Sequence, residues 1–321
     1  MADTASPEPA AHLVSVLVVN WNTRDLTLAC IDSLARQETD RLTLETVVVD
    51  NGSVDGSREA LDRRSDINFV ANTSNVGYAA AVNQAFSRAG GDLVLLLNSD
   101  VELPPRAVAE LTTFLDDHPD AAGAAPLYLN PDGTPQAFHF RFPTFPMLLA
   151  NVSTLFSSLP GARARERSYR MLDDDFSVPR RVDQPSASCL LLRRSALPAN
   201  GVFDERYPIF FNDVRLAQEI AGSGRTLWVV PAVEVKHEGH ASTRQLGPVL
   251  KRQYLASLMR LLEDTAPASR RFLLGTVVLA QGLVARAVGR ADALPVADLV
   301  AAVRGDPGGL PAAPQSTGRT A

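Results

Sequence analysis

Short apolar runs alternate with amphipathic stretches over the first 120 residues of the chain. Four of the runs are rich in Val, Ile and Leu and have the length of buried parallel strands. They are residues 14–21, 44–50, 67–71 and 92–98. Apolar residues at helical spacing predict helices after each run, the first of them capped by Thr23. The predicted helices are 23–37, 55–64, 76–89 and 104–117. This alternation predicts right-handed crossovers and a doubly wound, mostly parallel α/β sheet flanked by helices.

The pattern changes after residue 120. An apolar segment at 121–129 is followed by turn residues at 130–134 and another apolar run, which predicts a hairpin-like excursion. Residues 140–185 mix charged and apolar side chains without a clean period, and we interpret them as an insertion on the substrate side. Regular structure is expected again over 186–197, in a helix over 213–222 and in a strand over 226–231 that ends at Pro231.

Four parts of the chain follow from this pattern. A disordered tail is expected at 1–12, an α/β domain over 13–245, a helical segment over 246–304 and a second disordered, Gly- and Pro-rich tail at 305–321. The apolar stretch 272–285 has only 14 residues, too few to span a bilayer. It fits either a helix packed on the domain or one lying in a membrane interface.

Composition narrows the class of protein. A chain of 321 residues that is 45% hydrophobic can bury a full core, which excludes a disordered chain or a small disulfide scaffold. The net charge of −5 argues against a protein that wraps nucleic acid. This charge divides into −10 over residues 1–243 and +5 over 244–321. A basic C-terminal segment on an acidic domain predicts contact with an anionic membrane surface.

Cysteines and the N-terminal residues predict a cytoplasmic location. Cys30 and Cys189 lie in apolar runs without the spacing of a metal site, so we expect buried, reduced thiols. Residues 1–12 hold acids and prolines where a secretory signal has a basic start and an apolar stretch.

Polar residues follow three of the predicted strands, where ligands collect in open α/β sheets. They are residues 20–22, 50–53 and 98–100. Asp100 is the most informative, because a carboxylate at the end of an apolar strand is costly unless a cation accompanies it. Mg²⁺ takes one or two protein carboxylates and leaves its other positions to water and phosphates. The alternative is that Asp100 caps the next helix or turn.

Six segments, in this order, carry a resemblance to a known family. They are VSVLVVNWNTRDLTLACIDSL, VVVDNGSVDGS, NVGYAAAVNQAF, LLLNSDV, FDERYPIFFNDVRL and VKHEGHAST. Residues 13–245 resemble family-2 glycosyltransferases of the GT-A fold, above all the rhamnosyltransferase-like branch that builds bacterial cell-surface polysaccharides. The resemblance implies an inverting, metal-dependent transfer of a sugar from a dTDP- or UDP-linked donor to a hydroxyl of a glycan or polyprenyl-linked acceptor. It places the enzyme in the cytoplasm, at the inner face of the cell membrane.

The resemblance also implies a set of donor-binding residues. Asp50 matches the position that binds the nucleotide base, and Asn98 offers an oxygen towards the ribose or metal-bound water. The whole set is Asn20, Asn22, Asp50, Asn75, Gly77, Asn83, Asn98 and Ser99. From the residues alone, Asp50 equally suits an Asx-turn, and the segment from Asn75 an ordinary capped helix.

For the metal, the resemblance implies Asp100 and His237 with Mg²⁺ or Mn²⁺, and Asn98 replaces the first acid of the family's DXD motif. Ser242, Thr243 and Arg244 match positions near the diphosphate. Without the resemblance, His237 and His240 are interpreted as exposed loop residues.

Asp213 matches the catalytic base, which removes a proton from the acceptor hydroxyl. Asn212 stands where the family has Glu, and Arg215 where another acid is common, so we expect a lower pKa for Asp213 than in a cluster of carboxylates. The alternative is a helix N-cap. Asp204 and Glu205 either face the acceptor or form salt bridges.

Two other functions stay open on the sequence. A sugar nucleotidyltransferase shares the fold class, but no Gly-rich loop with Arg or Lys follows the first strand. A catalytically silent donor-binding or scaffold protein is compatible with Asn98 and Asn212 in place of acids.

Overall fold

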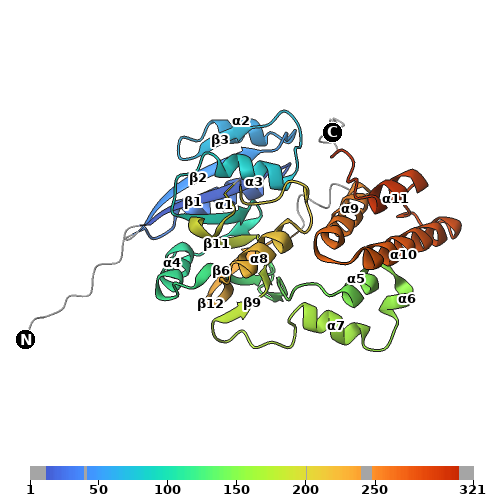
Figure 1. The fold of residues 1–321 in the computed structure, drawn as a ribbon. Helices are drawn as coiled ribbons and strands as arrows, with labels where there is room; N and C mark the ends of the chain where they lie inside the picture. Colours follow the sequence, from blue (N-terminus) through green and yellow to red (C-terminus); the bar gives the residue numbers. More distant parts are fainter. Residues whose placement is uncertain (1–11, 40–41, 200, 240–247, 311–321) are drawn as a thin grey trace, which may run out of the picture.

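A ten-stranded mixed sheet forms the centre of the computed structural model, which describes residues 12–39, 42–199, 201–239 and 248–310 (Figure 1). Its main path runs in the order β3-β2-β1-β4-β11-β6-β12-β5. These strands are β1 (His12–Asn20), β2 (Leu42–Asp50), β3 (Asn68–Ala71), β4 (Leu93–Asn98), β5 (Val101–Glu102), β6 (Ala121–Leu129), β11 (Cys189–Arg193) and β12 (Thr226–His237). Off this path, β7 (Pro135–Gln136) pairs with β6 and β9 (Arg180–Val182) with β12, while β8 (His139–Phe140) and β10 (Gln184–Pro185) form a separate pair.

The predicted alternation of strands and helices is confirmed in the first half. Strands β1 to β4 are joined in parallel order through α1 (Arg24–Ala35), α2 (Ser57–Asp62) and α3 (Tyr78–Phe86), and α4 (Ala107–Asp117) follows. Thr23 does stand at the N-cap of α1, but its hydroxyl donates to Asn20 Oδ1 (2.9 Å) and makes no capping bond. The hairpin predicted after residue 120 is the antiparallel pair β6 and β7.

Two expectations about the later strands are corrected. The strand predicted to end at Pro231 continues to His237. Proline lacks an N–H for the ladder, and the register with β6 shifts between Val230 and Glu234, so a bulge absorbs it within the strand. The segment expected over 186–197 forms β11, which is antiparallel to both β4 and β6, followed by the short 3₁₀ helix η1 (Arg194–Ala196).

Both faces of the sheet are covered. Helices α1, α2 and α4 pack on one face, and α3 and α8 (Asn212–Gly222) pack on the other. Neighbouring residues of a strand alternate between the faces, as Val18 and Val19 do, because successive side chains of a strand point to opposite sides. The two cysteines are free and buried among these residues, as expected.

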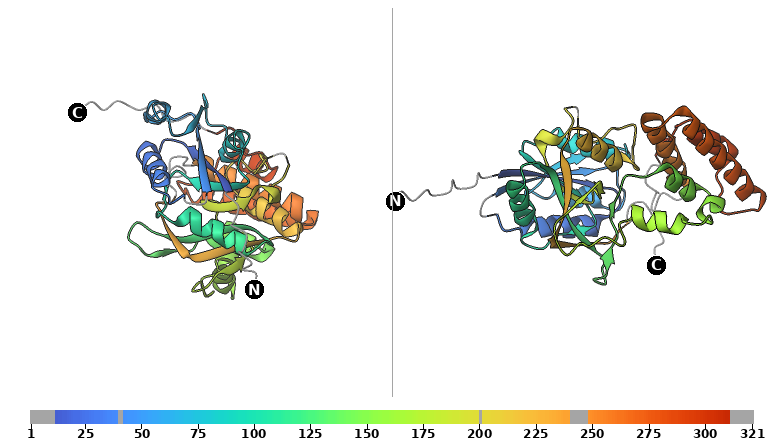
Figure 2. Two further views of the ribbon diagram at one scale, coloured as in Figure 1. Left: turned by 90° about the vertical axis from the view of Figure 1, so that its left-hand side faces the viewer. Right: turned by 60° about the horizontal axis from the view of Figure 1, so that its bottom comes forward.

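A separate helical core lies beside the sheet (Figure 2). It is built from α5 (Phe145–Val152), α6 (Thr154–Ser157), α7 (Ala162–Tyr169), α9 (Pro248–Thr265), α10 (Ala268–Ala287) and α11 (Val296–Val303). Met147 and Leu148 of the expected insertion share this core with Leu258 and Leu274, so residue 245 does not separate two cores. No helix in the described ranges is long and apolar enough to cross a membrane.

Part of the predicted C-terminal tail is packed. Arg252 on α9 donates to Asp306 Oδ2 (2.9 Å), and Gln253 donates to the carbonyl of Pro307 (3.0 Å). The expectation of a disordered tail from residue 305 is therefore wrong for residues 305–310, whereas 1–11 and 311–321 lie outside the described residues.

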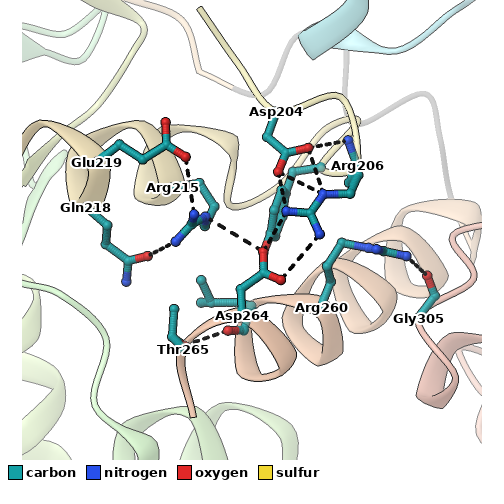
Figure 3. Close-up of polar contacts among 11 residues, drawn as sticks. Asp204, Arg206, Arg215, Gln218, Glu219, Arg260, Asp264, Thr265 and Gly305 are labelled. Atoms are coloured by element: carbon teal, nitrogen blue, oxygen red, sulfur yellow. Dashed lines mark hydrogen bonds and ion pairs between the residues drawn. The ribbon is translucent and has the colours of Figure 1, made fainter. Parts of the chain in front are cut away.

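A cluster of charges joins α8 and the loop before it to α9 (Figure 3). Asp264 accepts hydrogen bonds from Tyr207 Oη (2.8 Å) and Arg206 Nη2 (2.9 Å), and its carboxylate lies 3.9 Å from Arg215 Nε. Arg206 also pairs with Asp204. This cluster ties the helical core to the helix that carries Asp213.

Candidate functional site

A cavity of about 310 Å³ opens beyond the carboxyl ends of β1 and β4, where the fold rule places ligands. Its walls come from the first turns of α3 and α8, from the loop before β11 and from the end of β12. The polar residues that line it are Asn51, Asn75, Tyr78, Asn98, Ser99, Asp100, Ser186, Ser188, Asn212, Asp213 and His237. The catalytic and metal-binding residues expected from the sequence therefore share one cavity.

The side chain of Asn98 is fixed from two sides. Its amide nitrogen donates to Ser188 Oγ (3.0 Å), and its oxygen accepts from Tyr78 Oη (3.1 Å). Burial, with the charges of Asp213 and Asp100 adding to it, raises the pKa of Tyr78 well above its usual value. Tyr78 is therefore a neutral hydrogen-bond donor near both carboxylates.

Asp100 and His237 face each other in the floor of the cavity. His237 Nε2 lies 3.4 Å from Asp100 Oδ1, and both side chains are almost fully buried. His237 Nδ1 lies 2.9 Å from Gln136 Oε1. The nitrogen of that amide donates to Asn130 Oδ1 (2.7 Å) and to the carbonyl of His237 (2.6 Å), which fixes the amide's orientation.

The contact with Gln136 decides which nitrogen of His237 carries the proton. Because Gln136 presents an oxygen, Nδ1 of His237 carries the proton and Nε2 is left as an acceptor towards Asp100. Nε2 and the carboxylate of Asp100 are two acceptors that could hold a metal ion between them. Within the described ranges no three His, Cys, Asp or Glu side chains gather around one point. A metal here would have two protein ligands, the number that Mg²⁺ takes when substrate phosphates supply others.

Asp213 lies in the first turn of α8, after Phe211, whose φ is +64°. Its Oδ2 accepts a hydrogen bond from Gln184 Nε2 (2.9 Å). Burial raises the pKa of Asp213 above its ordinary value, against hydrogen bonds from Val214 N–H and Gln184 that act to lower it. Burial, which the spacing of neighbouring acids does not reveal, is the largest influence on this pKa. The helix N-cap is Phe211, so Asp213 does not cap α8.

The residues after β1 and β2 form a network below the cavity lining. Asp50 is fully buried, with Asn20 Nδ2 donating to its Oδ1 (2.7 Å) and Ser53 N–H to its Oδ2 (3.1 Å). Asn22 accepts from Val54 N–H (2.9 Å) through its side chain. These contacts shape the loop after β2, and none of Asn20, Asn22 and Asp50 is among the residues that line the cavity.

Residues around the start of α3 divide into two groups. Asn75 lines the cavity, and its Oδ1 accepts from Gly77 N–H (3.0 Å). Gly77 has φ +96°, and a Cβ there would lie 3.1 Å from Pro208 Cβ, so the backbone requires glycine. Asn83 is turned away from the cavity: it donates to the carbonyl of Phe203 (2.8 Å) and accepts from two N–H groups of that loop. The structure does not bring Asn83 to the site.

Of the two acids before α8, Asp204 alone forms one of the expected salt bridges with a described residue. Asp204 forms an ion pair with Arg206 (2.6 Å), and Glu205 accepts a hydrogen bond from Asn83 (3.0 Å). Neither lines the cavity. His240, Ser242, Thr243 and Arg244 lie outside the described residues.

Sequence reasoning missed the groups that orient the site. Gln136 comes from the two-residue strand β7 and Gln184 from the two-residue strand β10, and nothing in the pattern near either residue points to a role. Trp21 lines the cavity between two predicted residues, and its place at the end of a predicted strand could have identified it.

Comparison with known proteins identifies the family and the fold. The model of the family described as Glycosyl transferase family 2 matches residues 15–197. The chain is 29% identical over 212 residues, 62% of its length and 68% of the relative's, to an N-acetylglucosaminyl-diphospho-decaprenol L-rhamnosyltransferase of Mycobacterium tuberculosis. It is 30% identical over 113 residues, 34% of either protein, to abequosyltransferase RfbV of Salmonella typhimurium.

Two solved structures share the fold at low sequence identity. The mannosyltransferase PcManGT of Pyrobaculum calidifontis, in complex with GDP-Man and Mn²⁺, matches with a TM-score of 0.54 at 20% identity over 93% of this chain and 81% of that one. Residues 1–349 of S. aureus TarS in complex with UDP match with a TM-score of 0.51 at 17% identity over 90% and 80%. The chain belongs to glycosyl transferase family 2, is a glycosyltransferase and has the GT-A fold.

Proposed function

We propose that this protein is an inverting, metal-dependent glycosyltransferase that moves a sugar from a nucleoside-diphosphate donor to a hydroxyl of a lipid-linked glycan. The observation that carries the proposal is the convergence of Asp213, Asp100 and His237 on one cavity at the carboxyl ends of the strands. The buried carboxylate of Asp213 would accept the proton of the acceptor hydroxyl. Asp100 and His237 would hold a metal ion at the donor diphosphate.

Asp213 has the properties of a general base. Burial raises its pKa, which makes the carboxylate a stronger base. In a single displacement, the acceptor hydroxyl oxygen forms a bond to the anomeric carbon and its proton passes to Asp213. The bond from the anomeric carbon to the diphosphate breaks on the opposite face, so the configuration inverts.

Asp100 and His237 would hold Mg²⁺ or Mn²⁺. The bound ion supplies positive charge to the departing nucleoside diphosphate. Tyr78 and the amide of Asn98 line the same wall as neutral hydrogen-bonding groups for the donor. Structures of similar fold were solved with Mn²⁺ and a nucleotide sugar or UDP, which supports a divalent ion here.

The donor and acceptor are proposed from the mycobacterial relative. Its name describes rhamnose transfer to a decaprenyl-linked N-acetylglucosaminyl diphosphate. We therefore place dTDP-rhamnose first among donors, a UDP-sugar second, and a polyprenyl-linked acceptor at the inner face of the cell membrane, in cell-surface polysaccharide synthesis.

The test is a donor panel with Mg²⁺ or Mn²⁺, read by release of nucleoside diphosphate and by transfer to a polyprenyl-linked acceptor. We expect Asp213→Asn to lower the transfer rate by about 10²- to 10⁴-fold while donor affinity changes little. Asp100→Ala should remove metal-dependent donor binding. Asp62→Asn, on the exposed surface of α2, is the matched control and should be fully active.

Three outcomes would contradict the proposal. Full activity of Asp213→Asn would show that the base is another group. Release of pyrophosphate from a sugar 1-phosphate and a nucleoside triphosphate would show a nucleotidyltransferase. Donor binding without any turnover across the panel would show a catalytically silent protein.

A further inference from the structure

Helix α10 carries a long uncharged stripe on its exposed side. Five large apolar side chains of α10 and its C-cap are exposed: Phe272, Leu273, Leu283, Val284 and Val288. Phe272 is 78% exposed and Val288 68%. The exposed positions between and beside them, 269, 276, 280 and 287, hold only Ser, Thr and Ala. At a rise of 1.5 Å per residue the stripe is about 29 Å long.

The opposite side of α10 is fixed in the helical core. Leu274 and Val278 are buried there, and a Cβ on Gly275 would lie 3.0 Å from Val303. A Cβ on Gly282 would overlap Leu299. Because α11 packs this closely on the two glycines, α10 cannot rotate its apolar stripe inwards. Figures 1 and 2 show α10 at the outer end of the molecule, far from the sheet.

Two arginines border the stripe. On a helix with 3.6 residues per turn, Arg270 and Arg286 fall on opposite edges, each roughly a quarter of a turn from the centre of the stripe. Arg270 stacks on the ring of Phe145, 5.5 Å from its centre, and Arg286 donates to the carbonyl of Leu294 (3.3 Å). Neither has an acidic partner among the described residues. An apolar stripe with basic edges is typical of a helix that lies in a lipid interface.

Other occupants fit the stripe less well. The segments outside the described ranges contain only Met1 and Leu246 as large apolar residues, so they cannot cover it. A second copy packed face to face on the stripe would give these arginines no acidic partner from its own α10, because α10 holds no acidic residue. An anionic lipid surface complements them instead. The region 244–321 is also basic, with 10 basic and 5 acidic residues.

We propose that α10 docks on an anionic membrane surface, with Phe272, Leu283 and Val284 among the acyl chains and Arg270 and Arg286 at the phosphates. This binding depends on α10 and not on the reaction. That this docking brings the cavity close to a polyprenyl-linked acceptor rests on the proposed function.

Co-sedimentation with phosphatidylcholine vesicles, with and without phosphatidylglycerol, tests the surface. The full chain should bind the anionic vesicles at least about tenfold more tightly than neutral ones. Phe272→Ser with Leu283→Ser should weaken binding to anionic vesicles by about tenfold or more. Arg270→Gln with Arg286→Gln should remove most of the preference for anionic lipid. Leu172→Ser with Val178→Ser, at exposed apolar positions away from α10, is the matched control and should bind normally.

Thermal melting of each variant separates loss of fold from loss of binding. Unchanged vesicle binding by a folded Phe272→Ser, Leu283→Ser variant would overturn the proposal. So would a dimer seen by light scattering that this variant converts to a monomer, since the stripe would then be a self-association surface. Vesicle binding without any glycosyl transfer would refute the proposed function and leave the docking surface standing.

Discussion

Replacing Asp264 by alanine tests whether the charged cluster between α8 and α9 stabilises the fold. The side chain of Asp264 is 15% exposed. It accepts a hydrogen bond from the hydroxyl of the fully buried Tyr207 at 2.8 Å. Leaving that hydroxyl without a partner costs about 1–3 kcal/mol. The ion pair with Arg206 adds at most about 1 kcal/mol, because the Arg206 side chain is 51% exposed.

The third partner of Asp264 is more enclosed. Arg215 is mostly buried, with Nε 3.9 Å from Asp264, and it keeps its contacts with Gln218 and Glu219 when Asp264 is removed. Together these terms predict that Asp264→Ala lowers the free energy of unfolding by about 3 kcal/mol, less than the loss of a fully buried pair. Asp264→Asn, which still accepts from Tyr207, should recover about 1 kcal/mol of this.

Asp292 provides the control, because it also pairs with two cations, Lys251 at 3.0 Å and Arg290 at 2.9 Å. All three of these side chains are well exposed and screened by solvent, so Asp292→Ala should cost much less stability than Asp264→Ala. Urea unfolding, followed by tryptophan fluorescence and by circular dichroism to check that the two transitions coincide, measures both variants. Equal losses for Asp264→Ala and Asp292→Ala would refute the reasoning.

Three further predictions follow from buried groups and tight turns. Burial lowers the pKa of His139 to about 3, so its neutral form is required in the fold and stability falls as pH drops below the unfolded value near 6.5. The free energy of unfolding, measured with urea, should therefore fall by about 2 kcal/mol between pH 7 and pH 5, and His139→Gln should lack this fall. Equal pH dependence in both proteins would contradict the prediction. Gly52 and Gly133 both have positive φ, but a Cβ on Gly52 would lie 2.7 Å from a backbone Cα while one on Gly133 has nothing within 4 Å. Gly133→Ala should therefore cost about 1 kcal/mol by thermal unfolding and Gly52→Ala at least twice that, and equal costs would show that the clash is relieved. Gln184→Leu removes a side-chain donor that lowers the pKa of Asp213, so the acid limb of the pH–rate profile for transfer should move to higher pH; an unmoved limb would show that Gln184 does not act on the base.

The alternation of apolar runs was sufficient to predict the first four strands of the sheet and its first four helices. Short-range patterns carry that information, since strand and helix spacing are local properties. The same holds for the place of Asp100 at a strand end, and in the structure this side chain lines the cavity.

Contacts between distant segments could not be predicted in this way. Gln136 and Gln184 reach the site through loops and two-residue strands, and their partners lie 101 and 29 residues away. Asn83 lies six residues after Gly77 on the same helix, but its amide is bonded at both ends to the loop that follows β11. The shared core of α5 and α10 is likewise invisible to periodicity, because each helix is amphipathic by itself.

The two buried cysteines allow opening of the protein core to be measured by thiol labelling. Cys30 and Cys189 have no exposed surface, and burial raises the pKa of both thiols, so neither the access nor the thiolate needed for labelling exists in the closed state. Cys30 lies on α1 with its Sγ 3.6 Å from the carbonyl of Asn98, beside the strand end that carries the site. A thiol reagent therefore reacts only when α1 separates from the sheet, and the labelling rate measures how often the centre of this protein opens under native conditions.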